Sequence, residues 1–163
     1  MTIPVTTYNL AAELGALLLR KNFSITTAES CTGGGIAYVL TAVPGSSAYL
    51  DRSFVTYSNK AKQQLLGVKA ETLLQYGAVS KETVLEMAVG AAKAAGAEVA
   101  VAVSGIAGPD GGSAAKPVGT VHFCFEISGH QVLSHRIFDG DRACVRQQAI
   151  DFVLQQLILL LTD

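Results

Sequence analysis

The sequence predicts one α/β domain over residues 1–163, with three layers (α/β/α) around a mixed, mostly parallel sheet. Two patterns support this fold class. Segments with apolar residues at helical spacing alternate with short runs rich in β-branched and aromatic residues. The nearly continuous apolar run 98–108 is typical of a central strand that is covered on both faces. A chain of 163 residues is also long enough to bury a core without disulfides or a structural metal.

The first half of the chain is expected to alternate between helices and strands. Leu10, Leu14 and Leu17 have the spacing of one helix face. Asn59 is the expected N-cap of the helix that follows the second strand. The expected elements are a helix over 6–22, a strand over 23–29, a helix over 34–43, a strand over 49–58, and short helices over 59–68 and 69–79.

The second half predicts a long helix, a buried strand, a hairpin and a closing helix. Ser80 is expected to begin the long helix and Gly96 to end it. Every turn signal indicates a loop over 108–119, and Asp141 is the expected N-cap of the last helix. The expected elements are a helix over 80–96, strands over 98–108, 120–129 and 131–140, and a helix over 141–163.

Composition and charge exclude several partners. The formal net charge is −1 and no run of basic residues is longer than a pair, so neither nucleic acid nor a membrane surface is an expected partner. The hydrophobic fraction of 50% and the leucine-rich last helix favour a homodimer or a larger homo-oligomer. No cationic-then-apolar signal opens the chain and the last apolar run is too short to span a bilayer, so the expected location is cytoplasmic.

The cysteines and histidines indicate neither a disulfide framework nor a standard metal site. Their spacings contain no CxxC pair and no helical HxxxH pair: Cys31, Cys124, Cys144, His122, His130 and His135. No metal and no other cofactor is therefore expected. Two histidines facing one way on a strand remain a weak alternative.

Three glycine-flanked loops each follow an expected strand, over 30–35, 57–62 and 104–112. Ligands collect at the carboxyl ends of strands in open α/β sheets, so we expect these loops to meet in one site. The first loop offers backbone N–H groups at a helix N-terminus, which suit an anion such as phosphate. It matches neither the GxxxxGK[ST] nor the GxGxxG pattern, so the sequence favours neither a standard P-loop ATPase nor a Rossmann dinucleotide site.

Side chains in these loops have structural as well as catalytic interpretations. Ser30 is either the N-cap of the following helix or a nucleophile, and Cys31 is either a small buried apolar side chain or a competing nucleophile. Lys60 and Lys62 are typical of a solvated helix face, yet a neutral lysine is also able to act as the base for a serine. Ser104 places another hydroxyl at the end of an apolar strand.

Two arginines, Arg142 and Arg146, lie four residues apart near the start of the last helix. The helix dipole does not favour cations at that end. We therefore expect a ligand or a carboxylate partner for at least one of them.

Five segments closely resemble the CinA C-terminal domain family and come in the family's order. They are TTAESCTGGGIA, VPGSSAYLDRSFVTYSNKAKQQLLGV, YGAVSKETVLEMAVGA, VAVSGIAGPDGGSAAKPVGTVHF and FDGDRACVRQQAI. The resemblance runs from about residue 8 to the end. Stand-alone members of the family are nicotinamide-nucleotide amidases, and the expected form of this chain is the stand-alone one, without the larger N-terminal domain of two-domain relatives.

The resemblance implies metal-independent hydrolysis of the carboxamide of nicotinamide mononucleotide (NMN) to nicotinate mononucleotide and ammonia. The serine of the family's AESCTGG motif falls on Ser30, and the tyrosine and lysine of its YSNxxK motif fall on Tyr57 and Lys62. The hydroxyl position of SGIAGP falls on Ser104, and the arginine of GDR falls on Arg142.

The expected mechanism is acyl transfer. Ser30 attacks the carboxamide carbon, Lys62 takes the hydroxyl proton, and Tyr57 helps to orient or relay it. The backbone N–H groups of Gly33 and Gly34 are expected to stabilise the oxyanion.

Further residues are expected to bind the substrate. The phosphate is expected at Arg142 or at the backbone N–H groups of the turn formed by Gly45, Ser46 and Ser47. Glu29 is expected either to hold Lys62 or to contact the ribose; the sequence does not separate these roles.

Two other functions and one other base are kept open. A non-catalytic nucleotide-binding or regulatory module would use the same glycine loops, but it has no need of the set Ser30, Tyr57 and Lys62. A metal-dependent amidase would depend on the three histidines. Lys60 is the alternative base, although Lys62 is the better candidate because several relatives have no lysine at position 60.

Overall fold

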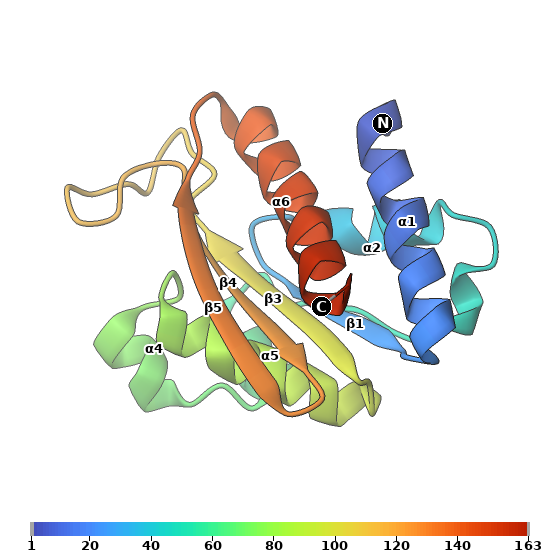
Figure 1. The fold of residues 1–163 in the computed structure, drawn as a ribbon. Helices are drawn as coiled ribbons and strands as arrows, with labels where there is room; N and C mark the ends of the chain where they lie inside the picture. The colour runs from blue at the N-terminus through green and yellow to red at the C-terminus, as the bar shows by residue number, and fades with distance from the viewer. Residues whose placement is uncertain (1, 163) are drawn as a thin grey trace.

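The computed structural model describes residues 2–162, which form a five-stranded sheet with helices on both faces (Figure 1). The helices are α1 (Val5–Lys21), α2 (Gly35–Thr41), the 3₁₀ turn η1 (Ser46–Ala48), α3 (Asn59–Leu66), α4 (Ala70–Tyr76), α5 (Lys81–Ala95) and α6 (Arg142–Thr162). The strands are β1 (Ile25–Glu29), β2 (Phe54–Val55), β3 (Val99–Gly105), β4 (Thr120–Ile127) and β5 (His130–Ile137). The predicted α/β/α fold class with a mixed sheet is confirmed.

The sheet has the order β2-β1-β3-β4-β5. β1 runs parallel to both β2 and β3, whereas β4 and β5 are antiparallel additions at the other side. The predicted hairpin is β4 and β5, joined through Ser128 and Gly129, which both have positive φ. Because β1, β2 and β3 are parallel, their carboxyl ends lie at one edge of the sheet, and the three glycine-flanked loops leave from there.

Each face of the sheet has its own apolar cluster. α1, α2 and α6 cover one face, and α4 and α5 cover the other (Figure 1). Ile25, Val101 and Phe123 point into the first cluster, whereas Ala100 and Cys124 point into the second. β3 contributes to both, which explains the continuous apolar run that predicted a central strand.

The segment 49–58 is where the predicted secondary structure is most wrong. Only Phe54 and Val55 form a ladder with β1, and Leu50 adds an isolated bridge to Ile25, since the segment begins in the turn after η1 and leaves the sheet after Thr56. Both ends of the segment stay next to β1, through Ile25 N–H to Tyr49 O (2.7 Å) and Thr56 N–H to Glu29 O (2.9 Å). Its β-branched and aromatic residues therefore indicate that the segment lies next to the sheet, although it does not form a full strand.

Two of three predicted helix caps are confirmed. The Ser80 hydroxyl accepts the Thr83 N–H and begins α5, and the Asp141 carboxylate accepts the Cys144 N–H at the start of α6. Asn59 is wrong as the cap of α3, because Ser58 takes that position and its hydroxyl accepts the Ala61 N–H.

Among the helices of residues 2–162, none combines the length and apolarity that crossing a bilayer requires.

Candidate active site

The turn after β1 presents Ser30 at the carboxyl edge of the sheet. The Ser30 N–H continues the sheet by donating to Val103 O (3.0 Å), and the Ser30 carbonyl accepts the Gly33 N–H (3.0 Å). Gly33 and Gly34 have φ of +59° and +91°, a backbone conformation that residues with a β-carbon adopt only at a cost in free energy. Two glycines are therefore required here by backbone geometry, and the tight turn holds Ser30, which is itself largely buried, at the carboxyl edge of the sheet.

The carboxylate of Glu29 holds this turn and the start of α2 together. Glu29 is fully buried and accepts the backbone N–H groups of Gly34 (3.1 Å), Ile36 (3.0 Å) and Ala37 (2.9 Å). It also accepts two hydroxyls, from Thr27 (3.0 Å) and Thr32 (2.6 Å). A carboxylate suits a helix N-terminus because the N–H groups there are unpaired and the dipole is positive.

This arrangement corrects two predictions. Ser30 is not the N-cap of α2, since that position is Gly34 and Glu29 supplies the acceptors instead. Glu29 does not hold Lys62, because its hydrogen bonds among residues 2–162 are those to the turn, to α2 and to the two threonines. The Ser30 hydroxyl is thus released from a capping role.

Lys62 reaches the Ser30 hydroxyl from α3. Its Nζ lies 3.1 Å from Ser30 Oγ, 2.8 Å from Thr56 O and 3.3 Å from Tyr57 O. The side chain is only 1% exposed, and burial lowers the pKa of its ammonium. All three neighbours are neutral oxygens, so none of these contacts replaces the stabilisation that a carboxylate would give to the charged form.

The neighbouring candidates for base and nucleophile have different surroundings. Lys60 is exposed on α3, whereas Lys62 is buried against Ser30. Cys31 is buried, and desolvation, the largest effect, together with the Glu29 carboxylate raises the pKa of its thiol to about 12. A thiol with that pKa carries almost no thiolate at neutral pH, which agrees with the interpretation of Cys31 as a buried apolar side chain.

Tyr57 and Arg142 meet at the mouth of the site. The Tyr57 hydroxyl accepts Arg142 Nη2 (3.0 Å), and Arg142 Nη1 donates to Gly108 O (3.0 Å). The tyrosine is 59% exposed, and only its backbone carbonyl contacts Lys62. Among residues 2–162 the Tyr57 hydroxyl makes no hydrogen bond to Lys62 or Ser30, so the proton relay through it stays a prediction.

Ser104 lies beside Ser30 on the neighbouring strand. Glu29 pairs with Val103 in the parallel register, so the next residues, Ser30 and Ser104, are level with each other. Ser104 is 1% exposed. The structure therefore brings Ser30, Lys62 and Ser104 to one point of the sheet edge.

The oxyanion prediction needs a correction. The Gly33 N–H already donates to Ser30 O and the Gly34 N–H already donates to Glu29, so neither is free for a substrate oxygen. Within residues 2–162, the Thr32 N–H has no acceptor, and the Cys31 N–H contacts only the thiol of its own residue. These two groups directly follow the serine and take over as candidates for stabilising an oxyanion.

Ser46 and Ser47 lie at the opposite end of β1. They belong to η1, whose following residue Tyr49 accepts the N–H of Ile25, the first residue of the strand. Ser30 follows the last residue of the same five-residue strand, so the length of β1, about 16 Å, separates the two ends. Within this chain they are not part of the cluster around Ser30, contrary to prediction.

Arg146 is a site residue that the sequence indicated only indirectly. Its Nη2 donates to Thr32 O (3.1 Å), and its guanidinium lies 3.4 Å from where a β-carbon on Gly33 would be. The signal was its spacing of four from Arg142, which places both arginines on one side of α6.

The histidines do not come together as a group. His122 and His135 stack across β4 and β5 with ring centroids 5.4 Å apart, while His130 begins β5 at its other end. Within the described part of the chain, residues 2–162, no three histidine, cysteine or acidic side chains are placed to hold a metal ion.

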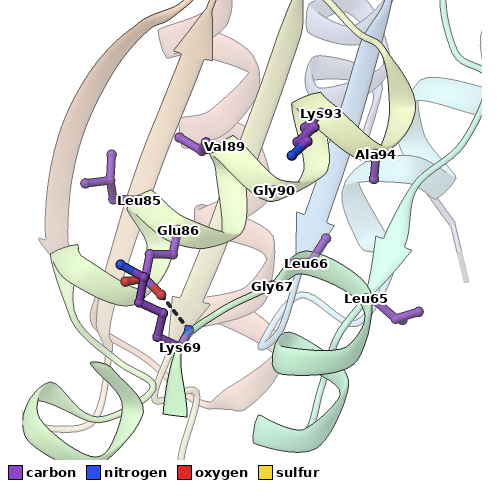
Figure 2. Close-up of a pocket in the computed structure, with 10 residues that line it drawn as sticks. All are labelled: Leu65, Leu66, Gly67, Lys69, Leu85, Glu86, Val89, Gly90, Lys93 and Ala94. Atoms are coloured by element: carbon purple, nitrogen blue, oxygen red, sulfur yellow. Dashed lines mark hydrogen bonds between the residues drawn. The ribbon is translucent and has the colours of Figure 1, made fainter. Parts of the chain in front are cut away.

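A cavity of about 650 Å³ lies apart from these residues, between α3 and α5. Figure 2 shows Leu65 of α3 and Val89 of α5 among its lining residues, and the bond from the Lys69 N–H to the Glu86 carboxylate (2.8 Å). Neither Ser30 nor Lys62 lines it.

Comparison with known proteins places the whole chain in a family. The sequence profile of the CinA C-terminal domain matches residues 7–161. The chain belongs to the CinA C-terminal domain family. Within this family, the nicotinamide-nucleotide amidohydrolase PncC of Enterobacter agglomerans is 59% identical over 149 residues, which cover 91% of this chain and 91% of that protein.

Two further relatives cover nearly the whole CinA C-terminal domain. The nicotinamide-nucleotide amidohydrolase PncC of Pseudomonas putida is 52% identical over 160 residues, 98% of this chain and 99% of that protein. The crystal structure of the competence/damage inducible protein CihA from Agrobacterium tumefaciens matches with a TM-score of 0.95 at 44% identity and covers 100% of both chains.

Proposed function

We propose that this chain hydrolyses the carboxamide of NMN to nicotinate mononucleotide and ammonia. The substrate is taken from the family and from relatives of similar length that are named nicotinamide-nucleotide amidohydrolase. The observation that carries the chemistry is the 3.1 Å contact between Lys62 Nζ and Ser30 Oγ. A buried lysine with a lowered pKa is a suitable base, because more of it is neutral near pH 7.

In the proposed first step, neutral Lys62 takes the hydroxyl proton while Ser30 Oγ attacks the carboxamide carbon. The resulting oxyanion is stabilised by the N–H groups of Cys31 and Thr32. The Lys62 ammonium then donates its proton to the amide nitrogen, the carbon–nitrogen bond breaks, and ammonia leaves. Water attacks the ester in the second step with Lys62 again as base, which releases the nicotinate product and restores Ser30.

Tyr57, Arg142 and Ser104 complete the proposed site. Tyr57 and Arg142 contact the substrate at the mouth, where an arginine and an exposed tyrosine lie together. Ser104 offers a hydroxyl level with the nucleophile. The cytoplasmic location and the homo-oligomer expected from composition remain predictions.

The purified chain is expected to release ammonia from NMN at a rate that excess EDTA leaves unchanged. The reason is that the proposed chemistry uses a serine and a lysine, and that residues 2–162 contain no cluster of three metal-binding side chains. The measurement is ammonia release with and without chelator. Loss of activity on chelation that zinc restores would support the metal-dependent amidase.

The same assay separates an enzyme from a nucleotide-binding module. A module would bind NMN without releasing ammonia. The structure favours the enzyme because burying a lysine costs free energy, and binding a nucleotide does not require a lysine against a serine hydroxyl.

A further inference from the structure

A second cavity, of about 350 Å³, lies between the start of α2 and the first turns of α6. Its lining residues are Gly35, Ala143, Cys144, Arg146, Gln147 and Ile150. Arg146 brings the only charged side chain to this lining. Both amide hydrogens of Gln147 are already donated, to Thr7 and Asp151, so the guanidinium supplies the side-chain N–H donors that are left to meet an anion.

Arg146 lacks a counter-ion within the described residues 2–162. One terminal nitrogen, Nη2, donates to the neutral carbonyl of Thr32, and Nε is buried without a partner. The other terminal nitrogen, Nη1, makes no hydrogen bond within residues 2–162 and is not among the buried unpartnered atoms, so it is open to solvent. The carboxylate of Asp141, at the start of the same helix, accepts the Cys144 N–H and forms no ion pair with Arg146. A partly buried guanidinium in this state is stabilised by an anion that accepts its free N–H groups.

The position of Arg146 fits one end of a mononucleotide. Thr32, which it contacts, is two residues from Ser30, a span of at most about 7 Å. An anion at Arg146 is therefore close enough to Ser30 to be one end of a ligand whose other end reaches the nucleophile. The pyridinium ring of NMN is positive and is repelled by a guanidinium, so the phosphate is the end that Arg146 attracts.

Arg142 is less suited to this role. Each of its terminal nitrogens already donates one N–H, to Gly108 O and to the Tyr57 hydroxyl, whereas Arg146 keeps a buried Nε–H that has no partner. We propose that Arg146 binds the phosphate of the mononucleotide in the cavity between α2 and α6. The identity of the substrate rests on the proposed function, whereas the phosphate site itself does not.

Replacing Arg146 by methionine is expected to raise the KM for NMN at least tenfold and to change kcat by less than threefold. Nicotinamide riboside, which lacks the phosphate, should be hydrolysed by Arg146→Met and by the unaltered chain with similar kcat/KM. Arg20→Met is the matched control, because Arg20 is an exposed arginine of α1 and its loss changes the net charge equally. Equal losses of kcat on both substrates would overturn the proposal and make Arg146 a residue that positions the turn through Thr32.

A second measurement detects the site without any turnover. Cys144 is an exposed thiol in the lining of the cavity, whereas Cys31 and Cys124 are buried with pKa values raised to about 12 by desolvation above all. Alkylation by iodoacetamide should therefore select Cys144. Inorganic phosphate should slow this alkylation in the unaltered chain and in Arg20→Met, and should have no effect in Arg146→Met.

The two measurements fail in different ways. A chain that releases no ammonia from NMN, but whose Cys144 is protected by phosphate only when Arg146 is present, would contradict the proposed function and support the phosphate site. Absence of protection in the unaltered chain, which needs no variant to fold, would overturn the site. Protection that persists in Arg146→Met would overturn the role of Arg146 as well.

Discussion

Replacing Lys62 by arginine is expected to lower the turnover of NMN by at least about 100-fold, the usual contribution of a general base. The amine must accept a proton from Ser30, 3.1 Å away, and a guanidinium does not lose its proton in the accessible pH range. Lys62→Met should lose as much, because it has no basic nitrogen. A residue that only bound phosphate would tolerate arginine, with a raised KM and a largely kept kcat.

The pH dependence of turnover tests whether Lys62 acts as the base. Burial lowers the pKa of Lys62, so the neutral amine becomes abundant at a lower pH than for an exposed lysine. Turnover of the unaltered chain should therefore rise with pH through this lowered pKa and then level off. The residual turnover of Lys62→Met should lack this rise, which a structural role for the lysine would not remove.

Lys60→Arg is the matched control, because Lys60 lies on the same helix but is exposed. It should keep near-normal turnover and the pH profile of the unaltered chain. Melting curves and far-UV circular dichroism of each variant check that it is folded. A folded Lys62→Arg with near-normal turnover would contradict the assignment of Lys62 as base and leave Tyr57 or Lys60 to be examined.

Glu29→Gln is expected to lower the free energy of unfolding by about 3 kcal/mol, because at least one buried N–H loses its acceptor and the others lose a charged one. The carboxylate accepts five donors, and three of these, from Gly34, Ile36 and Ala37, are backbone N–H groups that have no freedom to rotate away. The hydroxyls of Thr27 and Thr32 are able to turn and accept from an amide. The melting temperature should fall by roughly 6–12 °C for a chain of this size.

Turnover of Glu29→Gln should fall together with stability. The turn that Glu29 holds carries Ser30 and the N–H groups proposed for the oxyanion, so kcat should drop at least tenfold with little change in KM. Glu13→Gln is the control, since Glu13 is exposed on α1. Melting temperature and steady-state kinetics are measured for both. Unchanged stability in Glu29→Gln would show that the bonds to Glu29 contribute little, and a raised KM with normal kcat would favour contact with the ribose.

The sequence predicted the fold well where the signal was local. Apolar spacing identified the long helices, and the turn chemistry of Ser80 and Asp141 identified their starts, because these interactions join residues three apart. The segment 49–58 failed because strand propensity reports a pleated, half-buried environment, and only Phe54 and Val55 have a ladder partner there.

The site residues were predictable as types, but their partners were not. The choice of Lys62 over Lys60 came from the family resemblance, and the burial of Lys62 agrees with it. The role of Glu29 was missed because its carboxylate accepts backbone N–H groups of α2 up to eight residues further along the chain. The usual capping pattern does not reach that far. The separation of Ser46 and Ser47 from Ser30 depends on which end of β1 each turn joins, and spacing along the chain does not contain that information.

Because β2 is short, the active site can come apart while the rest of the sheet remains folded. Lys62 is carried by α3, which packs on α5 through Leu66, and the segment before α3 is tied to β1 through a two-residue strand and the bond from Thr56 N–H to Glu29 O. Segments with so few ladder bonds open at a lower free energy than central strands such as β3. An opening that also frees α3 from α5 would withdraw the amine from Ser30 while the rest of the sheet stays paired. The fraction of molecules able to react is then set by this local equilibrium, and ligands that hold the segment closed increase it without altering the core.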